Sequence, residues 1–191
     1  MTSSRIAILG WGSLLSDDPE QSSNWHGPWL NDGPSLKIEF SRISQTPPRR
    51  GVLTLVIDPT HGAMNRVAYC YSARGNVDEA IYDLAKRERM PTTRNIGCLV
   101  RSNRTEHSHD AASLESIRAW AIANDVDAVI WTGLQSNFDV MAGQAFSVAA
   151  AMGHLRGLDD NARAIAMDYV RCAPQFVRTP LRDALENAAL S

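Results

Sequence analysis

The chain has 191 residues, of which 44% are hydrophobic and 21% are charged, and its formal net charge is −2. This length and composition are typical of one globular domain, or of one domain with an extension. Because there is no basic block or stripe, nucleic acid is not an expected partner. No apolar run is long enough to predict a membrane span, so we do not expect a membrane partner either.

The cysteines and the N-terminal segment both favour a cytoplasmic protein. The three cysteines are far apart and odd in number, which fits neither a disulfide framework nor a zinc site: Cys70, Cys98 and Cys172. The apolar run at residues 6–9 is short, ends in glycine and precedes no small-residue cleavage pattern. We therefore expect no signal peptide and a reducing compartment.

The first part of the chain is rich in predicted strands. Unbroken or alternating apolar runs predict strands at residues 6–9, 37–44, 52–57 and 66–71. The last two are expected to form a hairpin around a turn at residues 58–62. A polar loop at residues 16–35 also carries Trp25, Trp29 and Leu30. Large apolar side chains in a long loop indicate that the loop packs over another part of the molecule.

Helices dominate toward the C-terminus. The pattern predicts single strands at residues 97–100 and 128–131, and helices at residues 77–89, 111–123, 145–154, 161–170 and 180–190. Asn76, with Glu79 three residues later, is the expected N-cap of the first helix, and Thr179 is that of the last. This order of elements indicates an α+β fold. We expect one domain over residues 1–140 and a helical extension over residues 141–191 that packs on it.

A glycine turn follows the first predicted strand directly, in the sequence Gly10-Trp11-Gly12-Ser13. Glycines at a strand end produce an abrupt turn, and such a turn exposes consecutive backbone N–H groups. These groups can hold an anion or a polarised carbonyl. The turn is therefore the first candidate for a binding site.

Glu88 is the second candidate, because it lies on the apolar stripe of the helix predicted at residues 77–89. Val77, Ile81 and Leu84 define that stripe, and Glu88 is four residues beyond Leu84. The helix dipole also disfavours an anion at the C-terminal end. Partial burial of such a carboxylate would raise its pKa and make it a better base near neutral pH.

The pattern alone leaves a second interpretation of Glu88 open. Helix ends fray and often reach solvent, so Glu88 is also compatible with a surface position. In that case its expected partner is a nearby arginine, for which the candidates are Arg87, Arg94 and Arg42.

Together these two features resemble the gamma-glutamylcyclotransferase-like family. Its members carry Tyr-Gly-Ser directly after the first strand and a catalytic glutamate in a Leu-Asp-x-x-Glu-Gly stretch at a helix end. Here Trp11-Gly12-Ser13 corresponds to the first motif, and residues 84–89, with Glu88, correspond to the second. The resemblance covers roughly residues 5–135. This chain departs from the family pattern at four positions, Trp11, Leu14, Ala85 and Arg89.

The resemblance implies a small mixed β-barrel flanked by helices, and a cyclotransferase that needs no metal or cofactor. The substrate would be a γ-glutamyl amine or amide, and Glu88 would act as general acid and base. The backbone of Gly10, Trp11, Gly12, Ser13 and Leu14 would hold a substrate carboxylate or the developing oxyanion. The products would be 5-oxoproline and a free amine.

Other interpretations carry less support. A dinucleotide loop needs glycine or alanine at position 15, which is Leu15 here. The cluster Glu106-His107-Ser108-His109-Asp110 precedes a helix, where such residues serve as turn and cap groups, and no third spaced histidine supports a metal site. Ser13 lacks the Gly-x-Ser-x-Gly context of a nucleophile.

Arg42 is a further candidate for substrate binding. On an alternating strand it shares a face with Phe40, opposite Glu39 and Ile43. It would then bind a substrate carboxylate or pair with Glu88, or else be an exposed edge-strand arginine. The alternative function is a non-catalytic small-molecule-binding or protein-interaction module on the same fold.

Overall fold

The computed structural model describes residues 4–16 and 22–189, and it has a mixed α+β fold. The chain clusters into two compact units. The first unit consists of Met1–Leu36 and Arg66–Leu134, and the second consists of Lys37–Asn65 and Gln135–Ser191. Residues 17–21, part of the predicted tryptophan-rich loop, lie outside the described ranges.

This division differs from the expected one, in which residues 1–140 form one domain. Residues 37–65 cluster with the C-terminal helices instead. The physical reason is visible in strand β2 (Ser35–Ile43), whose side chains contact helices that come much later in the chain. Phe40 makes an edge contact with the ring of Tyr169, and Glu39 accepts a hydrogen bond from the backbone of Leu181.

The first unit is built on a five-stranded sheet with the order β5-β1-β8-β6-β7. Its strands are β1 (Ile6–Gly10), β5 (Ala68–Tyr71), β6 (Ile96–Val100), β7 (Thr105–His107) and β8 (Ala128–Thr132). β1 and β8 are parallel, and the other pairs are antiparallel. In the described residues the sheet is open, with β5 and β7 at its edges, and is not the closed small barrel that we expected.

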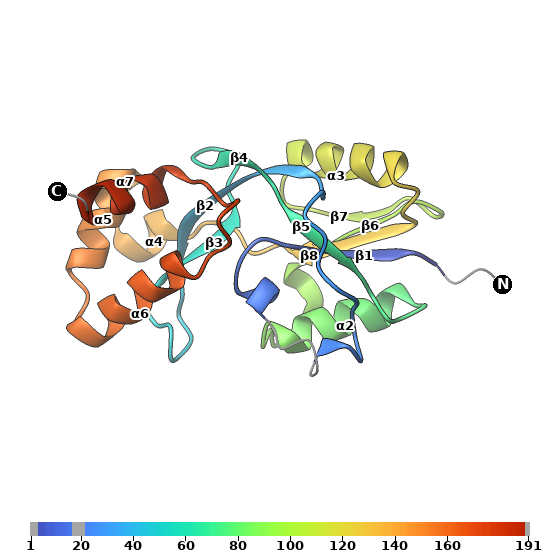
Figure 1. Ribbon diagram of the computed structural model, residues 1–191, viewed down its shortest axis with the longest axis horizontal. Helices are drawn as coiled ribbons and strands as arrows, with labels where there is room; N and C mark the ends of the chain where they lie inside the picture. The colour runs from blue at the N-terminus through green and yellow to red at the C-terminus, as the bar shows by residue number, and fades with distance from the viewer. Residues whose placement is uncertain (1–3, 17–21, 190–191) are drawn as a thin grey trace. The chain divides into compact units, whose positions relative to one another are not determined.

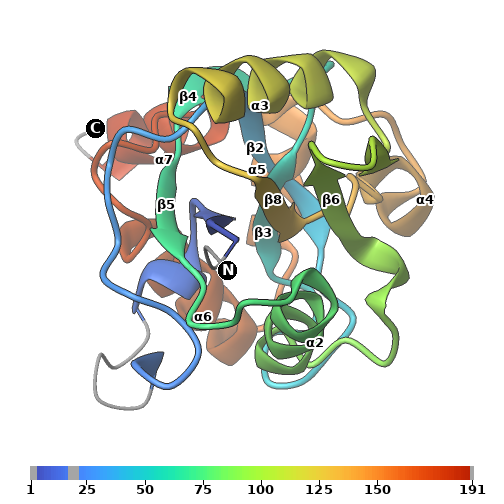
Figure 2. The ribbon, with the colours of Figure 1, turned by 90° about the vertical axis from the view of Figure 1, so that its right-hand side faces the viewer.

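Helices α2 (Val77–Arg87) and α3 (Ala111–Ala123) cover opposite faces of this sheet (Figures 1 and 2). This two-sided cover explains why residues 128–131 are all buried and show no alternation in sequence. Asn76 caps α2 as predicted, since its side chain accepts from the N–H of Asp78 at 2.7 Å. Asp110 caps α3, accepting from the N–H groups of Ala112 and Ser113.

Strand β7 was not predicted. All three of its residues are exposed, so its sequence carries no apolar signal, and only backbone pairing with β6 makes it a strand. No helix in the described part of the chain is long and apolar enough to cross a membrane.

The second unit combines a three-stranded sheet, with the order β3-β2-β4, and four helices. β3 (Leu53–Ile57) and β4 (Ala63–Arg66) flank β2. The helices are α4 (Phe138–Ala142), α5 (Val148–Arg156), α6 (Asp160–Arg171) and α7 (Pro180–Ala189), and α5 contacts both α6 and α7. The short helix α4 was not predicted.

The expected hairpin between residues 52–57 and 66–71 is wrong. β3 pairs with β2, whereas β5 pairs with β1 in the other unit. The turn after β3 is held by Asp58, which accepts hydrogen bonds from the N–H groups of Thr60 and His61. It leads the chain to the far edge of β2, so the two flanking strands are separated by β2 itself.

Strand β2 contains a register shift between Glu39 and Arg42. A shift of this kind breaks the alternation of faces. Glu39, Phe40 and Ser41 are all fully buried. The alternation expected for this strand, with Glu39 on the face opposite Phe40, therefore does not produce one buried and one exposed face.

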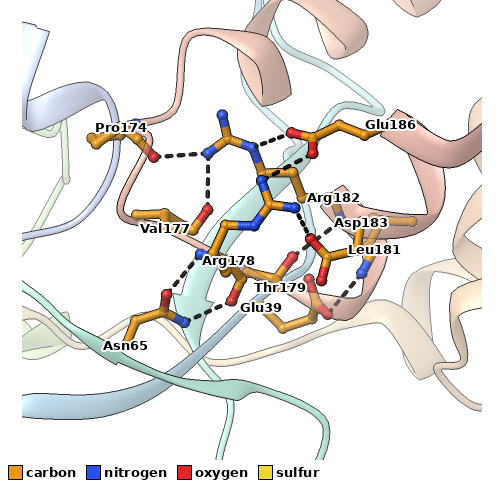
Figure 3. Close-up of polar contacts among 10 residues, drawn as sticks. All are labelled: Glu39, Asn65, Pro174, Val177, Arg178, Thr179, Leu181, Arg182, Asp183 and Glu186. Atoms are coloured by element: carbon orange, nitrogen blue, oxygen red, sulfur yellow. Dashed lines mark hydrogen bonds and ion pairs between the residues drawn. The ribbon is translucent and has the colours of Figure 1, made fainter. Parts of the chain in front are cut away.

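The buried Glu39 carboxylate contacts the start of α7 (Figure 3). Its Oε2 accepts from the N–H of Leu181 at 3.2 Å, and Thr179 caps the same helix through its hydroxyl, which accepts from the N–H of Arg182. These acceptors satisfy N–H groups that a helix start leaves unpaired. Burial raises the pKa of Glu39 and outweighs its hydrogen bonds, and the nearby Asp58 raises it further.

Arg182 ties the segment before α7 to the helix itself (Figure 3). It is buried, and its guanidinium donates to the carbonyl oxygens of Pro174 and Val177 and to the carboxylate of Glu186. Asn65 of β4 both donates to and accepts from the backbone of Arg178. The strands and helices of this unit are therefore joined by polar contacts as well as by apolar packing.

Substitution of Gly97 by alanine is expected to destabilise the first unit. A Cβ at this position would lie 2.1 Å from the indole of Trp131, which is fully buried. Overpacking of this kind costs about 2–3 kcal/mol. Urea unfolding followed by tryptophan fluorescence measures the effect. Gly153→Ala is the control, because it sits in α5 with open space around the added methyl group and is expected to stabilise the helix by about 0.5–1 kcal/mol. Equal stability of wild type and Gly97→Ala would contradict the packing described.

The stability difference between wild type and Glu39→Gln is expected to depend on pH. Because the folded-state pKa of Glu39 is raised above its ordinary value of 4.5, the folded state binds more protons than the unfolded state in the window above that value. Wild type should therefore lose stability relative to Glu39→Gln as the pH rises through that window. Urea unfolding at a series of pH values tests this, with the exposed Glu79→Gln variant expected to follow wild type. A constant difference between wild type and Glu39→Gln would refute the prediction.

Candidate functional site

The glycine turn begins where β1 ends. Gly10 is the last residue of that strand, and the 3-10 helix η1 (Ser13–Ser16) starts three residues later. The N–H of Leu15 donates to the carbonyl oxygen of Gly12 at 3.0 Å, which closes the turn. Trp11 and Leu14 are buried, whereas Gly12 and Ser13 are half-buried. The accessible part of the glycine turn is therefore its centre, at Gly12 and Ser13.

Trp29 packs directly against the turn. A Cβ on Gly10 would lie 2.8 Å from two atoms of the Trp29 ring and 2.7 Å from Leu15. Trp25 and Trp29 also pack against the apolar cluster that includes Ile8, Leu14 and Leu84. The expectation that the tryptophan-bearing loop packs over another part of the molecule is thus confirmed, and Gly10 must lack a side chain for the ring to lie there.

Glu88 caps the C-terminus of α2, which ends at Arg87, two residues earlier than predicted. Its N–H donates to the carbonyl oxygen of Leu84 at 3.0 Å, so its backbone position is defined by the last helical turn. Its side chain is 21% exposed, and its carboxylate lies 2.9 Å from the guanidinium of Arg87. Among the three arginine partners that the sequence left open, Arg87 pairs with Glu88.

Arg87 also connects Glu88 to the glycine turn. Its Nη1 donates to Glu88 Oε1 at 2.9 Å, and its Nη2 donates to the carbonyl oxygen of Ser13 at 2.7 Å. One guanidinium therefore bridges the helix end and the turn, which are more than seventy residues apart in the chain. The positive charge also offsets the unfavourable effect of the helix dipole on the Glu88 carboxylate.

The residue after Glu88 has the backbone conformation that usually requires glycine. Arg89 has φ of 54°, and the hydrogen bonds around it form a Schellman motif. The N–H of Arg89 donates to the carbonyl oxygen of Lys86 at 3.1 Å. The N–H of Met90 donates to the carbonyl oxygen of Ala85 at 2.9 Å. Glycine adopts a positive φ of this kind without strain, so Arg89 occupies a position that favours glycine.

Arg42 belongs to the second unit, whereas the glycine turn and Glu88 belong to the first. Its Nη1 donates to the carbonyl oxygen of Gln135 at 2.7 Å, which ties β2 to the segment before α4. Burial lowers the pKa of the Arg42 guanidinium. Arg42 thus makes a structural contact within its own unit, and its expected role in substrate binding stays a prediction.

A cavity of about 420 Å³ lies beside the turn, lined by Leu15, Ser22, Ser23 and residues 26–29. Two buried ring nitrogens from this lining, His26 Nε2 and Trp29 Nε1, have no hydrogen-bond partner among the described residues. Leaving a buried donor or acceptor unpaired costs about 1–3 kcal/mol. Sequence reasoning missed this cavity and the bridging role of Arg87. The tryptophans in a polar loop were the available signal for the cavity, but no sequence pattern indicated the arginine bridge.

The histidine cluster before α3 has local structural partners. His107 Nε2 lies 2.7 Å from the carbonyl oxygen of Arg94, and the rings of His107 and His109 contact each other edge to face. Asp110 is the helix cap, which agrees with the expectation that residues of this cluster serve as turn and cap groups. Within residues 4–16 and 22–189, no group of three or more His, Cys, Asp or Glu side chains is arranged to hold a metal ion.

The site therefore offers a carboxylate, a guanidinium and a half-buried backbone turn in one connected arrangement. A carboxylate can transfer protons, and backbone N–H groups of a turn can stabilise negative charge. Comparisons of the chain with protein-family models, with curated proteins and with solved structures found no match.

Replacing Arg89 by glycine is expected to stabilise the protein. A left-handed conformation costs a non-glycine residue about 1–2 kcal/mol, and glycine removes this cost. Part of the gain in stability is offset by the greater flexibility of glycine in the unfolded chain. We expect a net increase of about 0.5–1 kcal/mol in the free energy of unfolding, measured by urea titration. The control Lys86→Gly, inside the same helix, should lower stability by about 0.5–1 kcal/mol. A loss of stability in Arg89→Gly would show that the backbone at residue 89 is not left-handed.

Proposed function

We propose that this protein is a cofactor-independent cyclotransferase that releases 5-oxoproline from a γ-glutamyl amine or amide. The observation that carries the proposal is the Arg87 bridge, in which one guanidinium contacts both the Glu88 carboxylate and the Ser13 carbonyl. Ser13 and Glu88 belong to the two motifs on which the resemblance to the gamma-glutamylcyclotransferase-like family rests. The glycine-type backbone at Arg89 supports the same assignment of the helix-end motif.

In the proposed reaction, the lone pair of the neutral α-amino group of the substrate attacks the γ-carbonyl carbon, and a five-membered ring forms. Glu88 takes one proton from the attacking nitrogen as this bond forms. The tetrahedral intermediate then collapses, the bond to the leaving amine breaks, and Glu88 returns the proton to that nitrogen. Because attacking and attacked groups belong to one molecule, proximity supplies much of the rate advantage.

Arg87 would act as a positioning residue in this reaction. A guanidinium beside a carboxylate stabilises its charge, and the charged carboxylate is the form that accepts a proton. The contact with Ser13 would keep the base at a constant distance from the turn. Backbone N–H groups of the half-buried centre, Gly12 and Ser13, would hold the oxyanion or a substrate carboxylate.

The same resemblance supports a more specific description of the first unit than a mixed α+β fold. We propose that the first unit, which carries both motifs, corresponds to the family's mixed β core. β1 leads into the turn, and α2 ends at the glutamate, in the order that the family shows.

A non-catalytic binding module on the same fold is the second candidate. The observation that favours it is the packing of the Trp29 ring on Gly10, together with the burial of Trp11. Both place large apolar groups at the turn. The two candidates differ in whether the protein changes a γ-glutamyl compound or only binds it.

The test is 5-oxoproline release from a panel of γ-glutamyl amino acids and γ-glutamyl amines. We expect wild type to release 5-oxoproline from at least one of them. Glu88→Gln keeps the size of the side chain but cannot transfer the proton, so its kcat should fall by about 10²–10⁴-fold.

Glu79→Gln is the matched control, because Glu79 is an exposed carboxylate at the other end of α2. Its activity should stay within about twofold of wild type. Circular dichroism confirms that each variant is folded. If folded wild type releases no 5-oxoproline from any compound, the cyclotransferase proposal fails for that class. If Glu88→Gln is as active as wild type, the assignment of Glu88 fails.

A further inference from the structure

A second cavity, of about 490 Å³, is bordered by the β6–β7 hairpin and by the last two turns of α3, which runs beside that hairpin (Figure 1). Its volume falls within the range of roughly 300–1,000 Å³ that ligand pockets occupy. All of its lining comes from residues 99–122, which the structure describes without a gap. The cavity therefore belongs to the first unit alone.

The apolar part of the lining consists of Leu99 and Val100 from β6 and Ile122 from α3. Leu99 is buried, whereas Ile122 is 58% exposed. A ligand that covers such an exposed aliphatic side chain removes apolar surface from water, which is favourable. The cavity thus offers an aliphatic surface on which an apolar chain can pack.

Two guanidinium groups are held near Ile122 by contacts before and after it in the chain. Arg118 lies one helical turn before Ile122, and its Nη2 is 2.5 Å from Glu106 Oε1, so this guanidinium joins α3 to β7. Arg101 follows β6, and its Nη1 donates to the carbonyl oxygen of Val126, just beyond the end of α3, at 3.0 Å. The side chains of Arg118 and Arg101 are 28% and 34% exposed, so neither is enclosed.

Arg104, in the turn between β6 and β7, adds a third guanidinium to the lining. It is exposed, and its side chain makes no ion pair or hydrogen bond with another described residue. Its φ is 56°, a left-handed conformation that is unfavourable for a residue with a side chain. A strained residue whose side chain is not used within the chain indicates a role toward a group outside it.

The carboxylates near the cavity leave these guanidinium groups available. Glu106 is the one carboxylate in the lining, against three arginines. Glu115 and Asp125 pair with Arg118 and Arg101 from outside the lining, and they are 71% and 88% exposed. Ion pairs this exposed contribute little to stability, so another anion can replace these two carboxylates at low cost. The planar guanidinium group matches the oxygens of a carboxylate or a phosphate.

We propose that this cavity binds a small organic anion. Its carboxylate or phosphate group contacts the guanidinium groups of Arg101, Arg104 and Arg118, and its apolar chain packs on Ile122 and Leu99. This inference goes beyond the proposed function. The lining shares no residue with the glycine turn or with the end of α2, and binding here does not require that the protein release 5-oxoproline.

Hexanoate and hexyl phosphate are the probes, and their binding to the full chain is measured by ligand-observed NMR titration. 1-Hexanol and hexylamine have the same apolar chain without the negative charge. We expect saturable binding of at least one of the two anions, at least about tenfold tighter than that of either comparison compound, because only the anions gain charge-assisted hydrogen bonds. Which anion binds more tightly distinguishes a carboxylate site from a phosphate site.

Arg104→Gly removes one guanidinium and suits the left-handed backbone, so it is expected to fold and to bind the anion about tenfold more weakly. Arg104→Asn, which also tolerates this conformation, is the second variant if the first does not fold. Arg171→Gln is the control. Arg171 is an exposed arginine of α6 that does not line the cavity, and its replacement should leave the affinity unchanged.

Two further variants test the other parts of the lining. Ile122→Ala removes apolar contact from an exposed helix position and should weaken binding by about threefold or more. Glu106→Gln removes the repelling carboxylate and releases Arg118, so it should strengthen binding by about threefold or more. A gain of affinity of this kind does not arise from loss of structure.

The proposal is overturned if neither anion shows saturable binding to folded wild type, or if 1-hexanol or hexylamine binds as tightly as the anions. It is also overturned if the affinity is unchanged in folded Arg104→Gly or Ile122→Ala, or if Glu106→Gln binds the anion more weakly than wild type. None of these outcomes depends on the assay for 5-oxoproline.

Discussion

Burial of the five-stranded sheet on both faces is the constraint on which the candidate site depends. α2 and α3 cover the two faces, and the residues of β1 and β8 between them are almost entirely buried. Polar chemistry in such a layered unit is restricted to the ends of strands and helices, because a polar group within the layers would lose its hydration. The glycine turn at the end of β1 and Glu88 at the end of α2 both lie at such ends.

The Arg87 guanidinium connects these two ends. A carboxylate at a helix C-terminus is unfavourable by itself, and here it is accompanied by an adjacent positive charge that also contacts the turn. The helix end is held in place by the Schellman hydrogen bonds around Arg89, so the carboxylate starts from a defined backbone position. The arrangement supports a role for Glu88 in proton transfer, because a base must be held close to the group on which it acts.

The second unit shows how buried polar groups can organise a fold whose elements are far apart in the chain. Glu39 from β2 and Thr179 each accept hydrogen bonds at the start of α7, and Arg182 holds the segment that leads into that helix. Arg42 serves the same unit through its contact with Gln135.

Most individual elements could be predicted from the sequence, because their signals are local. The apolar run at residues 6–9, the Asn76 cap and the Asp110 cap all depend on residues a few positions apart. The glycine turn and the unusual position of Glu88 were visible for the same reason. Strand β7 was not, because an exposed edge strand is defined by its pairing partner and carries no apolar pattern.

By itself, then, the sequence determined most of the elements, the Asn76 and Thr179 caps and the two motifs of the candidate site. The tertiary structure alone decided which strands pair, that residues 37–65 belong with the C-terminal helices, and that Arg87 links Glu88 to Ser13. It also revealed the cavity beside Trp29. The physical reason is that local propensity depends on neighbours in the chain, whereas pairing, burial of charge and cavities depend on contacts between residues far apart in it.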